Sequence, residues 1–225
     1  MPLTRRHLLA ASLVVPWLGL PGCVTRVGEI PNLEEAIRRL LMVSTQRALA
    51  RLLAERGYFA DELARVNLPS QLGGNRFAEA FAVLLGSRMV QDRLLRLVND
   101  AAAEGARAAA PIVYETIRGM TIDDARLVLR GGPTAATDYL QRAIGEGLFN
   151  RMYPEVGRVL RLADDRIVAR ALQIATGIDF AGLQADVTRK AALGLYRAIA
   201  REESAIRADP AAAGDPMLAR LLGGR

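Results

Sequence analysis

The stretch that decides the fold is DFAGLQADVTRKAALGLYRAIAREESAIRAD, residues 179–209. Apolar side chains recur in it every three or four residues, which is the spacing of a helix with one buried face. The apolar arc of a helical projection contains Leu183, Val187, Ala191, Leu195, Ile199, Ala205 and Ile206. On the opposite face and its margins, Asp186 is spaced to pair with Lys190 across one turn. Glu203 is spaced in the same way to pair with Arg207. The stretch predicts the longest regular helix of the chain.

One acidic residue breaks this segregation. Glu202 falls in the middle of the apolar arc, where an ionised carboxylate loses hydration unless an arginine or several donors meet it. One interpretation is structural: the helix end protrudes beyond the core, or Glu202 joins two helices as a member of an ion pair. The other is functional: Glu202 lines a pocket and serves acid catalysis or proton-linked binding. Helix geometry favours the structural interpretation.

Helical patterns also fill most of the chain before this stretch. They predict one helix over residues 32–57 and another over residues 75–86. A third helix begins near Met89 and enters an alanine-rich segment that Pro111 interrupts or kinks. Between the first two helices, residues 58–72 predict a turn with an extended piece.

The second half of the chain is divided clearly by capping residues, glycine and proline. Residues 121–124 form a capping sequence that starts a helix, and Gly131 and Gly132 end that helix. Pro133 fits the first turn of the next helix, which extends to Leu148. The remaining predicted segments are residues 154–162, which Pro154 opens, residues 164–177, and a basic amphipathic segment at 216–222.

These patterns predict an all-α protein. The sequence contains no hairpin signal, no convincing alternation of period two and no repeat of fixed period. We therefore expect a compact bundle of roughly seven or eight helices, with no sheet, that forms a single domain over residues 32–225.

The first two dozen residues have the layout of a signal peptide. In TRRHLLAASLVVPWLGLPGC, residues 4–23, Arg5 and Arg6 supply a positive end, an apolar run follows, and glycine precedes Cys23. The apolar run is shorter than the about 20 residues that a membrane-spanning helix needs. The sequence therefore predicts an export signal peptide over residues 1–22.

Two details make this prediction more specific. The segment around Arg5 and Arg6 resembles the twin-arginine export signal, and residues 20–23 resemble the lipobox of bacterial lipoproteins, whose cysteine carries lipid and becomes the first residue. We therefore predict lipid attachment at Cys23 and a tether over residues 23–31. The location is then the periplasm, on the outer membrane rather than the inner one, because aspartate does not follow the cysteine. The alternatives are cleavage without lipid attachment, and a buried N-terminal helix with Cys23 in the core.

Cleavage at this position would remove several kinds of chemistry. The signal segment contains the only histidine, His7, and the only tryptophan, Trp17, and Cys23 is the only cysteine. A mature chain that begins at Cys23 lacks the residues for Ser-His-Asp and Cys-His catalysis, for histidine bases and for ordinary zinc sites. We expect no cofactor and no metal.

The distribution of charge and the two pairs of acidic residues give little indication of nucleic-acid or metal binding. The chain has 30 basic and 24 acidic residues, and its arginines are scattered without a companion motif, so we expect no nucleic-acid binding. A modest attraction to anionic lipid headgroups is the simpler interpretation. The acid pairs at residues 123–124 and 164–165 stand where helices begin, which suits the helix dipole better than a metal.

Three runs carry a resemblance to a known family. They are MTIDDARLVLRGGPTAATDYLQ at residues 120–141, LFNRMYPEV at 148–156 and DVTRKAALGLYRAIAREESAIRADPAA at 186–212. These runs resemble an uncharacterised bacterial family, domain of unknown function 4197, whose members are small exported helical proteins and often lipoproteins. The resemblance covers roughly residues 33–223. It implies a helical fold and an envelope location, and it supplies no activity, cofactor or catalytic residue.

The sequence thus predicts an exported, lipid-anchored envelope protein that acts as a binding or scaffolding module and not as an enzyme. Its partner would be another envelope component or the membrane face. A carboxylate-dependent hydrolase of cell-wall glycans is the first alternative, although the mature chain has no tryptophan to stack on sugar rings. The second alternative is a carrier with an apolar cavity for lipid between its helices.

Overall fold

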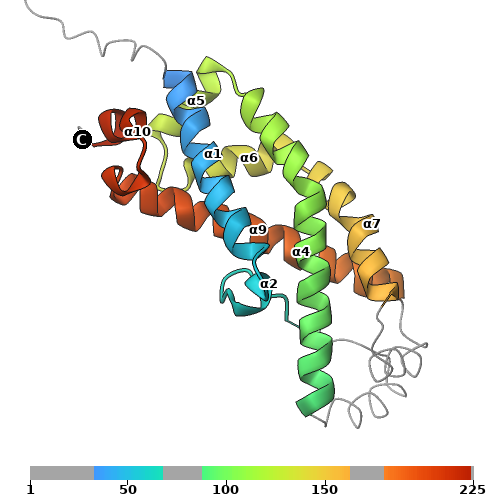
Figure 1. Cartoon of the computed structure of the whole chain (residues 1–225). Coiled ribbons are helices and arrows are strands. Elements are labelled where there is room, and N and C mark those ends of the chain that lie inside the picture. Colours follow the sequence, from blue (N-terminus) through green and yellow to red (C-terminus); the bar gives the residue numbers. More distant parts are fainter. Residues whose placement is uncertain (1–32, 68–87, 163–179, 224–225) are drawn as a thin grey trace, which may run out of the picture. The chain divides into compact units, whose positions relative to one another are not determined.

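The structure is a computed structural model of the chain that describes residues 33–67, 88–162 and 180–223. Within these residues it contains eight α-helices and one short 3₁₀ helix, and no strand (Figure 1). The predicted all-α fold is confirmed. The predicted helices at 75–86 and 164–177, and the whole segment 1–31, lie outside the described residues.

Helix α9, Phe180–Ala208, is the central element of the bundle. Helix α1, Leu33–Leu52, packs along one side of it, and α4, Arg88–Arg118, and α7, Gly147–Arg161, pack against its other faces (Figure 1). Because α9 is covered from several directions, it buries more than one stripe of residues. Ala205, predicted in the apolar arc, is exposed, whereas Glu203, predicted at the polar margin, is fully buried.

Helices α4 and α7 pack extensively against each other, and a glycine permits their approach. A β-carbon on Gly105 would lie 2.9 Å from the Cγ2 atom of Val156 and 3.2 Å from the Cε atom of Met152. The missing side chain lets Val156 and Met152 of α7 pack directly against the backbone of α4. This contact buries the alanine-rich half of α4.

Helix α4 has 31 residues and is longer than α9, which has 29. Of the two outcomes expected at Pro111, an interruption or a kink, the interruption is wrong, because α4 continues through this residue. Pro111 and Arg107, whose carbonyl loses its helical donor, are both exposed residues. Solvent on this side of α4 can therefore satisfy the freed carbonyl group.

A second proline also lies inside a helix. The prediction that Pro154 opens a new helical segment is wrong. Pro154 lies inside α7, on its exposed side. The boundary between the two helices comes earlier, at Gly145, whose positive φ of 54° ends α6, Ala135–Ile144. Leu148 therefore belongs to α7 and not to the helix before it.

The predicted start and end of α5, Ile122–Arg130, are confirmed. Thr121 and Asp124 form a reciprocal capping box, in which each side chain accepts from the other's backbone N–H. The following helix starts slightly later than predicted, because Thr134, and not a residue before Pro133, is the N-cap of α6.

Two short helices complete the described chain. The expected turn after α1 contains α2, Gly57–Ala60, which follows Arg56 in a left-handed conformation with φ of 60°. The predicted C-terminal helix is present as α10, Pro216–Leu222, after the 3₁₀ turn η2, Ala211–Ala213. None of the described helices combines the length and the apolar character that crossing a membrane requires.

Candidate functional site

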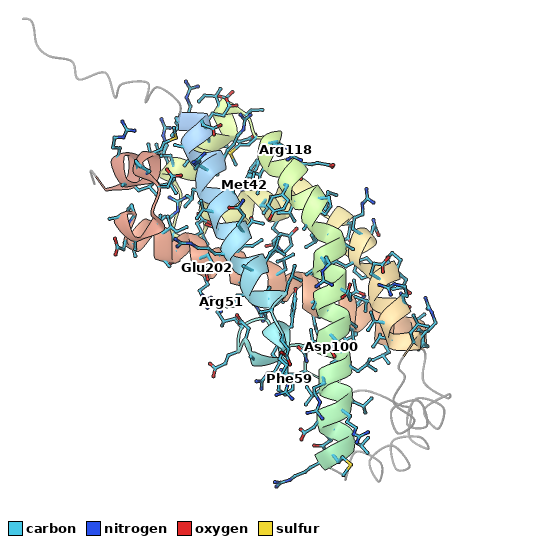
Figure 2. All side chains as sticks on the ribbon, viewed as in Figure 1. Met42, Arg51, Phe59, Asp100, Arg118 and Glu202 are labelled. Atoms are coloured by element: carbon cyan, nitrogen blue, oxygen red, sulfur yellow. The ribbon has the colours of Figure 1, made fainter. Side chains whose placement is uncertain are left out.

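Glu202, the residue singled out by its position in the apolar arc, lies between α9 and α1. Its side chain is 8% exposed, and its Oε1 atom lies 3.0 Å from an Nη atom of Arg51 near the end of α1. Figure 2 labels both residues where the two helices face each other. The Nε atom of Arg201 lies 3.7 Å from the same oxygen. Glu202 is therefore a member of an ion pair that joins two helices.

Arg201 extends this ion pair into a network with Asp61, the C-cap of α2. Its two Nη atoms donate to the two carboxylate oxygens of Asp61 at 3.0 and 2.7 Å. Asp61 also accepts from the backbone N–H groups of Leu63 and Ala64. Four charges, in the order Asp61, Arg201, Glu202 and Arg51, thus alternate in sign and hold the loop after α2 against α1 and α9.

The electrostatics of Asp61 follow from these contacts. Burial acts to raise the pKa of its carboxyl group, but the hydrogen bonds and charge of Arg201 and the two backbone donors outweigh burial. The pKa of Asp61 is therefore held below its ordinary value. The ionised form of this carboxylate is a structural requirement of the network.

A glycine lets this loop approach α9. A β-carbon on Gly194 would lie 2.7 Å from the carbonyl oxygen of Ala64. The Tyr58 hydroxyl donates to the carbonyl oxygen of Ala191 on the same part of α9, at 3.2 Å. The network therefore sits at a point where backbone and side chains are tightly packed.

The sequence pattern places Glu203, the next residue, at the polar margin of α9 and does not predict its burial. It is fully buried and faces the beginning of α6. Its carboxylate accepts from the backbone N–H groups of Ala136 at 2.9 Å and Thr137 at 2.7 Å, and from the Thr137 hydroxyl at 2.7 Å. A carboxylate in this position satisfies the free N–H groups of the first turn and complements the positive end of the helix dipole.

Arg207 completes this buried group. Its Nε atom donates to Glu203 at 2.8 Å, and an Nη atom lies 3.4 Å from the carbonyl oxygen of Val128 on α5. The predicted pairs Glu203 with Arg207 and Asp186 with Lys190 are both confirmed. Glu203 and Arg207 together connect α9 to α6 and α5.

A sequence signal for this group existed, although it was indirect. The N-cap residue of α6, Thr134, makes no side-chain capping hydrogen bond, and the third residue of the helix is Thr137 instead of an acid. A helix start without a local acceptor needs one from elsewhere in the fold. An acid on the margin of a neighbouring helix is a natural source.

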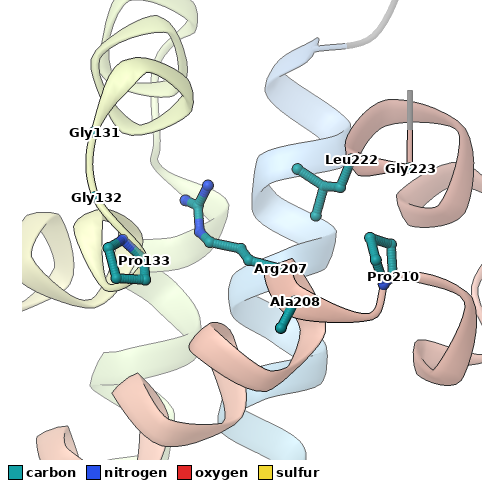
Figure 3. Close-up of a pocket in the computed structure, with 8 residues that line it drawn as sticks. All are labelled: Gly131, Gly132, Pro133, Arg207, Ala208, Pro210, Leu222 and Gly223. Atoms are coloured by element: carbon teal, nitrogen blue, oxygen red, sulfur yellow. The ribbon is translucent and has the colours of Figure 1, made fainter. Parts of the chain in front are cut away.

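The Gly131-Gly132 turn between α5 and α6 stands beside this group and borders two pockets. The first has a volume of about 420 Å³ and lies between this turn and the C-terminal ends of α9 and α10 (Figure 3). It is lined by Gly131, Gly132, Pro133, Arg207, Ala208, Pro210, Leu222 and Gly223. Figure 3 shows the Arg207 guanidinium group extending from α9 toward the glycine turn.

The second pocket, of about 530 Å³, is an open groove between α5 and α6. It is lined by Asp124, Leu127, Val128, Gly131, Gly132, Ala135, Asp138, Tyr139, Arg142 and Ala143. Burial and the neighbouring Asp124 raise the pKa of the Tyr139 hydroxyl, which therefore stays protonated at neutral pH. The lining combines apolar side chains with the polar groups of Asp124, Asp138, Tyr139 and Arg142, and such a mixed groove is suited to binding.

The remaining predicted residues divide into two groups. Asp123 pairs with Arg126 at 3.0 Å and Asp124 caps α5, and no three potential metal ligands gather within the described chain. Arg5, Arg6, Cys23 and the acid pair at 164–165 lie outside the described residues.

The comparisons with known proteins add one finding. The family model described as "Protein of unknown function (DUF4197)" matches residues 30–223. The chain belongs to this family. The match contains all of the described helices, and therefore both carboxylate groups on α9 and both pockets beside the glycine turn. No curated protein and no solved structure matches the chain.

Proposed function

We propose that this chain is an exported protein of the bacterial envelope, anchored to a membrane through lipid on Cys23, and that it works by binding or scaffolding. The layout of residues 4–23 supports the export signal and the anchor. The domain that follows it begins at Leu33, after a short tether. The outer membrane is the proposed site of the anchor.

The binding role is favoured over glycan hydrolysis by the contacts of the two buried glutamates on α9, whose carboxylates are already paired within the protein. A glycan hydrolase needs a carboxylic acid at the scissile bond, generally with a second carboxylate about 5–9.5 Å away. Glu202 is occupied by Arg51 and Arg201, and Glu203 is occupied by three donors of α6 and by Arg207. These partners take the hydrogen-bonding positions that a substrate would need, and they connect helices.

The anchor is tested by the mass of the protein isolated from membranes of its native host. We expect a chain that begins at Cys23 and carries the added mass of lipid. Cys23→Ala should abolish lipid addition and release the protein from the membrane fraction, and replacing both Arg5 and Arg6 by lysine should reduce export. An uncleaved chain with a free thiol would contradict the proposal.

The alternative function, hydrolysis of cell-wall glycan, is tested on purified cell-wall polymer. We expect no soluble fragments from the wild-type protein, and the same melting behaviour with and without the polymer fragments. Glu202→Gln is the matched control variant. Release of fragments by the wild-type protein, lost in a folded Glu202→Gln variant, would instead identify a hydrolase.

A further inference from the structure

Among the described residues, a few large apolar side chains are exposed. They are Leu63, Met89, Ile122, Leu127, Leu162 and Leu193. Leu127 on α5 is the most exposed of them, at 72%. Leu63, Met89 and Leu162 are close in sequence to stretches outside the described chain, whereas Leu127 lies well within residues 88–162. An exposed leucine on a short, well-capped helix is a feature of the protein's surface and not of its core.

The outer side of α5 combines this leucine with basic residues. The helix buries Ala125 and Val128, and its exposed residues are Ile122, Asp123, Arg126, Leu127 and Arg130. Asp123 pairs with Arg126 at 3.0 Å, so the charge of Arg130 is the one on this helix side that no acid of the helix balances. Arg118, at the exposed end of α4, precedes it (Figure 2). Arg118 and Arg130 form no ion pair with any other described residue. Apolar side chains among arginines are the composition of a surface that meets lipid headgroups.

Helix α5 lies beside the beginning of α1. An Nη atom of Arg38 donates to the carbonyl oxygen of Met120 at 2.6 Å, directly before α5. On the other side, the Nε atom of Arg39 donates to Asp215 at 2.5 Å, directly before α10. The first turns of α1 are therefore held between α5 and α10 (Figure 1).

The chain upstream limits how far this end can be from an anchor. The nine residues 24–32 connect Cys23 to Leu33, and when fully extended this connection spans at most about 35 Å. The other end of α1 is a further about 30 Å away, because the helix has 20 residues. A short tether keeps the α5 surface at a high effective concentration near the anchoring membrane, so that even a weak affinity suffices.

We propose that the outer surface of α5 docks on the membrane that carries the lipid anchor. Leu127 and Ile122 enter the headgroup region, and Arg118 and Arg130 meet anionic headgroups there. This inference rests on the proposed anchoring at Cys23. It gives the domain an orientation, in which the network around Asp61 and Glu202 points away from the bilayer.

The test uses the full chain, lipidated in its host, with a single cysteine introduced at Leu127 and labelled with an environment-sensitive fluorophore. The protein is reconstituted in vesicles of phosphatidylethanolamine and phosphatidylglycerol that contain brominated lipid as a quencher. The matched control is Leu193→Cys, an exposed leucine of α9 beside the loop at Ala64. We expect the label at position 127 to lose most of its emission and the label at 193 to keep it.

Two further measurements separate the possible failures. Combining Arg118→Glu with Arg130→Glu should reduce quenching at position 127, and the remaining quenching should be less sensitive to salt. If the mass shows lipid on Cys23 but quenching is equal at the two positions, or absent at 127, the docking surface is wrong and the proposed anchor stands. If Cys23 carries no lipid, both proposals are overturned. If Cys23 carries lipid and the label at 127 is strongly quenched while the label at 193 is not, both the anchor and the docking surface are supported.

Discussion

Glu202 and Glu203 are neighbours in the sequence, yet they belong to two different kinds of site. Glu202 faces α1 and pairs with Arg51, whose side chain is 55% exposed. Glu203 faces α6, is fully buried and pairs with Arg207, whose side chain is 11% exposed. The two ion pairs differ in the burial of the arginine. The charge of a water-exposed guanidinium group is largely screened, so the pair of Glu202 with Arg51 is the weaker one.

The comparison also explains how one helix can bury two adjacent acids. Residues one position apart on an α-helix are about 100° apart around its axis. Only a helix with neighbours on several sides can bury both, and α9 has α1 on one side and α6 on another. The group around Glu203 fixes α6 to α9, whereas the network around Glu202 fixes α1 and the loop after α2.

The largest effect is expected at Glu203. Glu203→Ala leaves Arg207 without its acidic partner and two N–H groups of α6 without an acceptor in a buried place. Removing one partner of a buried ion pair costs about 3–5 kcal/mol, and we expect a loss of unfolding free energy of this size. Urea denaturation measures it. Glu202→Ala is the matched control, and an equal loss there would abolish the distinction between the two residues.

A smaller effect is expected at Thr137, which contributes one donor to the same carboxylate. Thr137→Val keeps the shape and the backbone N–H but removes the hydroxyl group. A hydrogen bond to a charged group contributes about 1.5–3 kcal/mol, so the unfolding free energy should fall by roughly this amount. Thr116→Val is the control, because that hydroxyl bonds only to the helical carbonyl of Ile112. No loss at Thr137 would mean that the backbone donors alone hold Glu203.

Helix boundaries that depend on local residue types were predictable from the sequence, whereas boundaries and contacts that depend on packing were not. The capping box of α5 and the end of α9 follow from local residue types, and both were predicted at their observed places. Because proline disfavours helix interiors, the sequence predicts that Pro111 interrupts or kinks its helix and that Pro154 opens a new one. Each instead lies on the exposed side of a helix that packing keeps continuous.

The candidate site was predictable only in part, because some of its contacts join residues that are far apart in the sequence. A helical projection that assumes one buried face identifies Glu202 as unusual and places Glu203 at the margin of the polar face. The burial of Glu203 depends on α6, which is more than 60 residues away in the sequence. Long-range pairing of this kind leaves no local pattern, apart from the missing acceptor at the start of α6.

The network around Glu202 should respond to pH through Asp61. Because the pKa of Asp61 is lower in the folded protein than its ordinary value, the ionised carboxylate adds stability above that value. This contribution is lost as the pH falls through the lowered pKa. Asp61→Asn should therefore cost about 1–2 kcal/mol at pH 7, and the difference from the wild-type protein should shrink below about pH 4. A difference that stays constant from pH 7 to pH 3 would contradict the role of the charge.

The smallest effect is expected at Glu202 itself. Its partner Arg51 is more than half exposed, so salt and water weaken the pair, and Glu202→Gln should cost no more than about 1 kcal/mol. Glu202→Leu should cost no more than Glu202→Gln, because replacing a buried ion-pair member by an apolar side chain of similar size is often neutral or stabilising. A double-mutant cycle with Arg51→Met and Glu202→Gln should give a coupling that fades in high salt. The cycle for Arg207→Met and Glu203→Gln should keep its coupling there, because both side chains are shielded from solvent. If the two couplings respond to salt in the same way, exposure of the arginine does not distinguish the two sites.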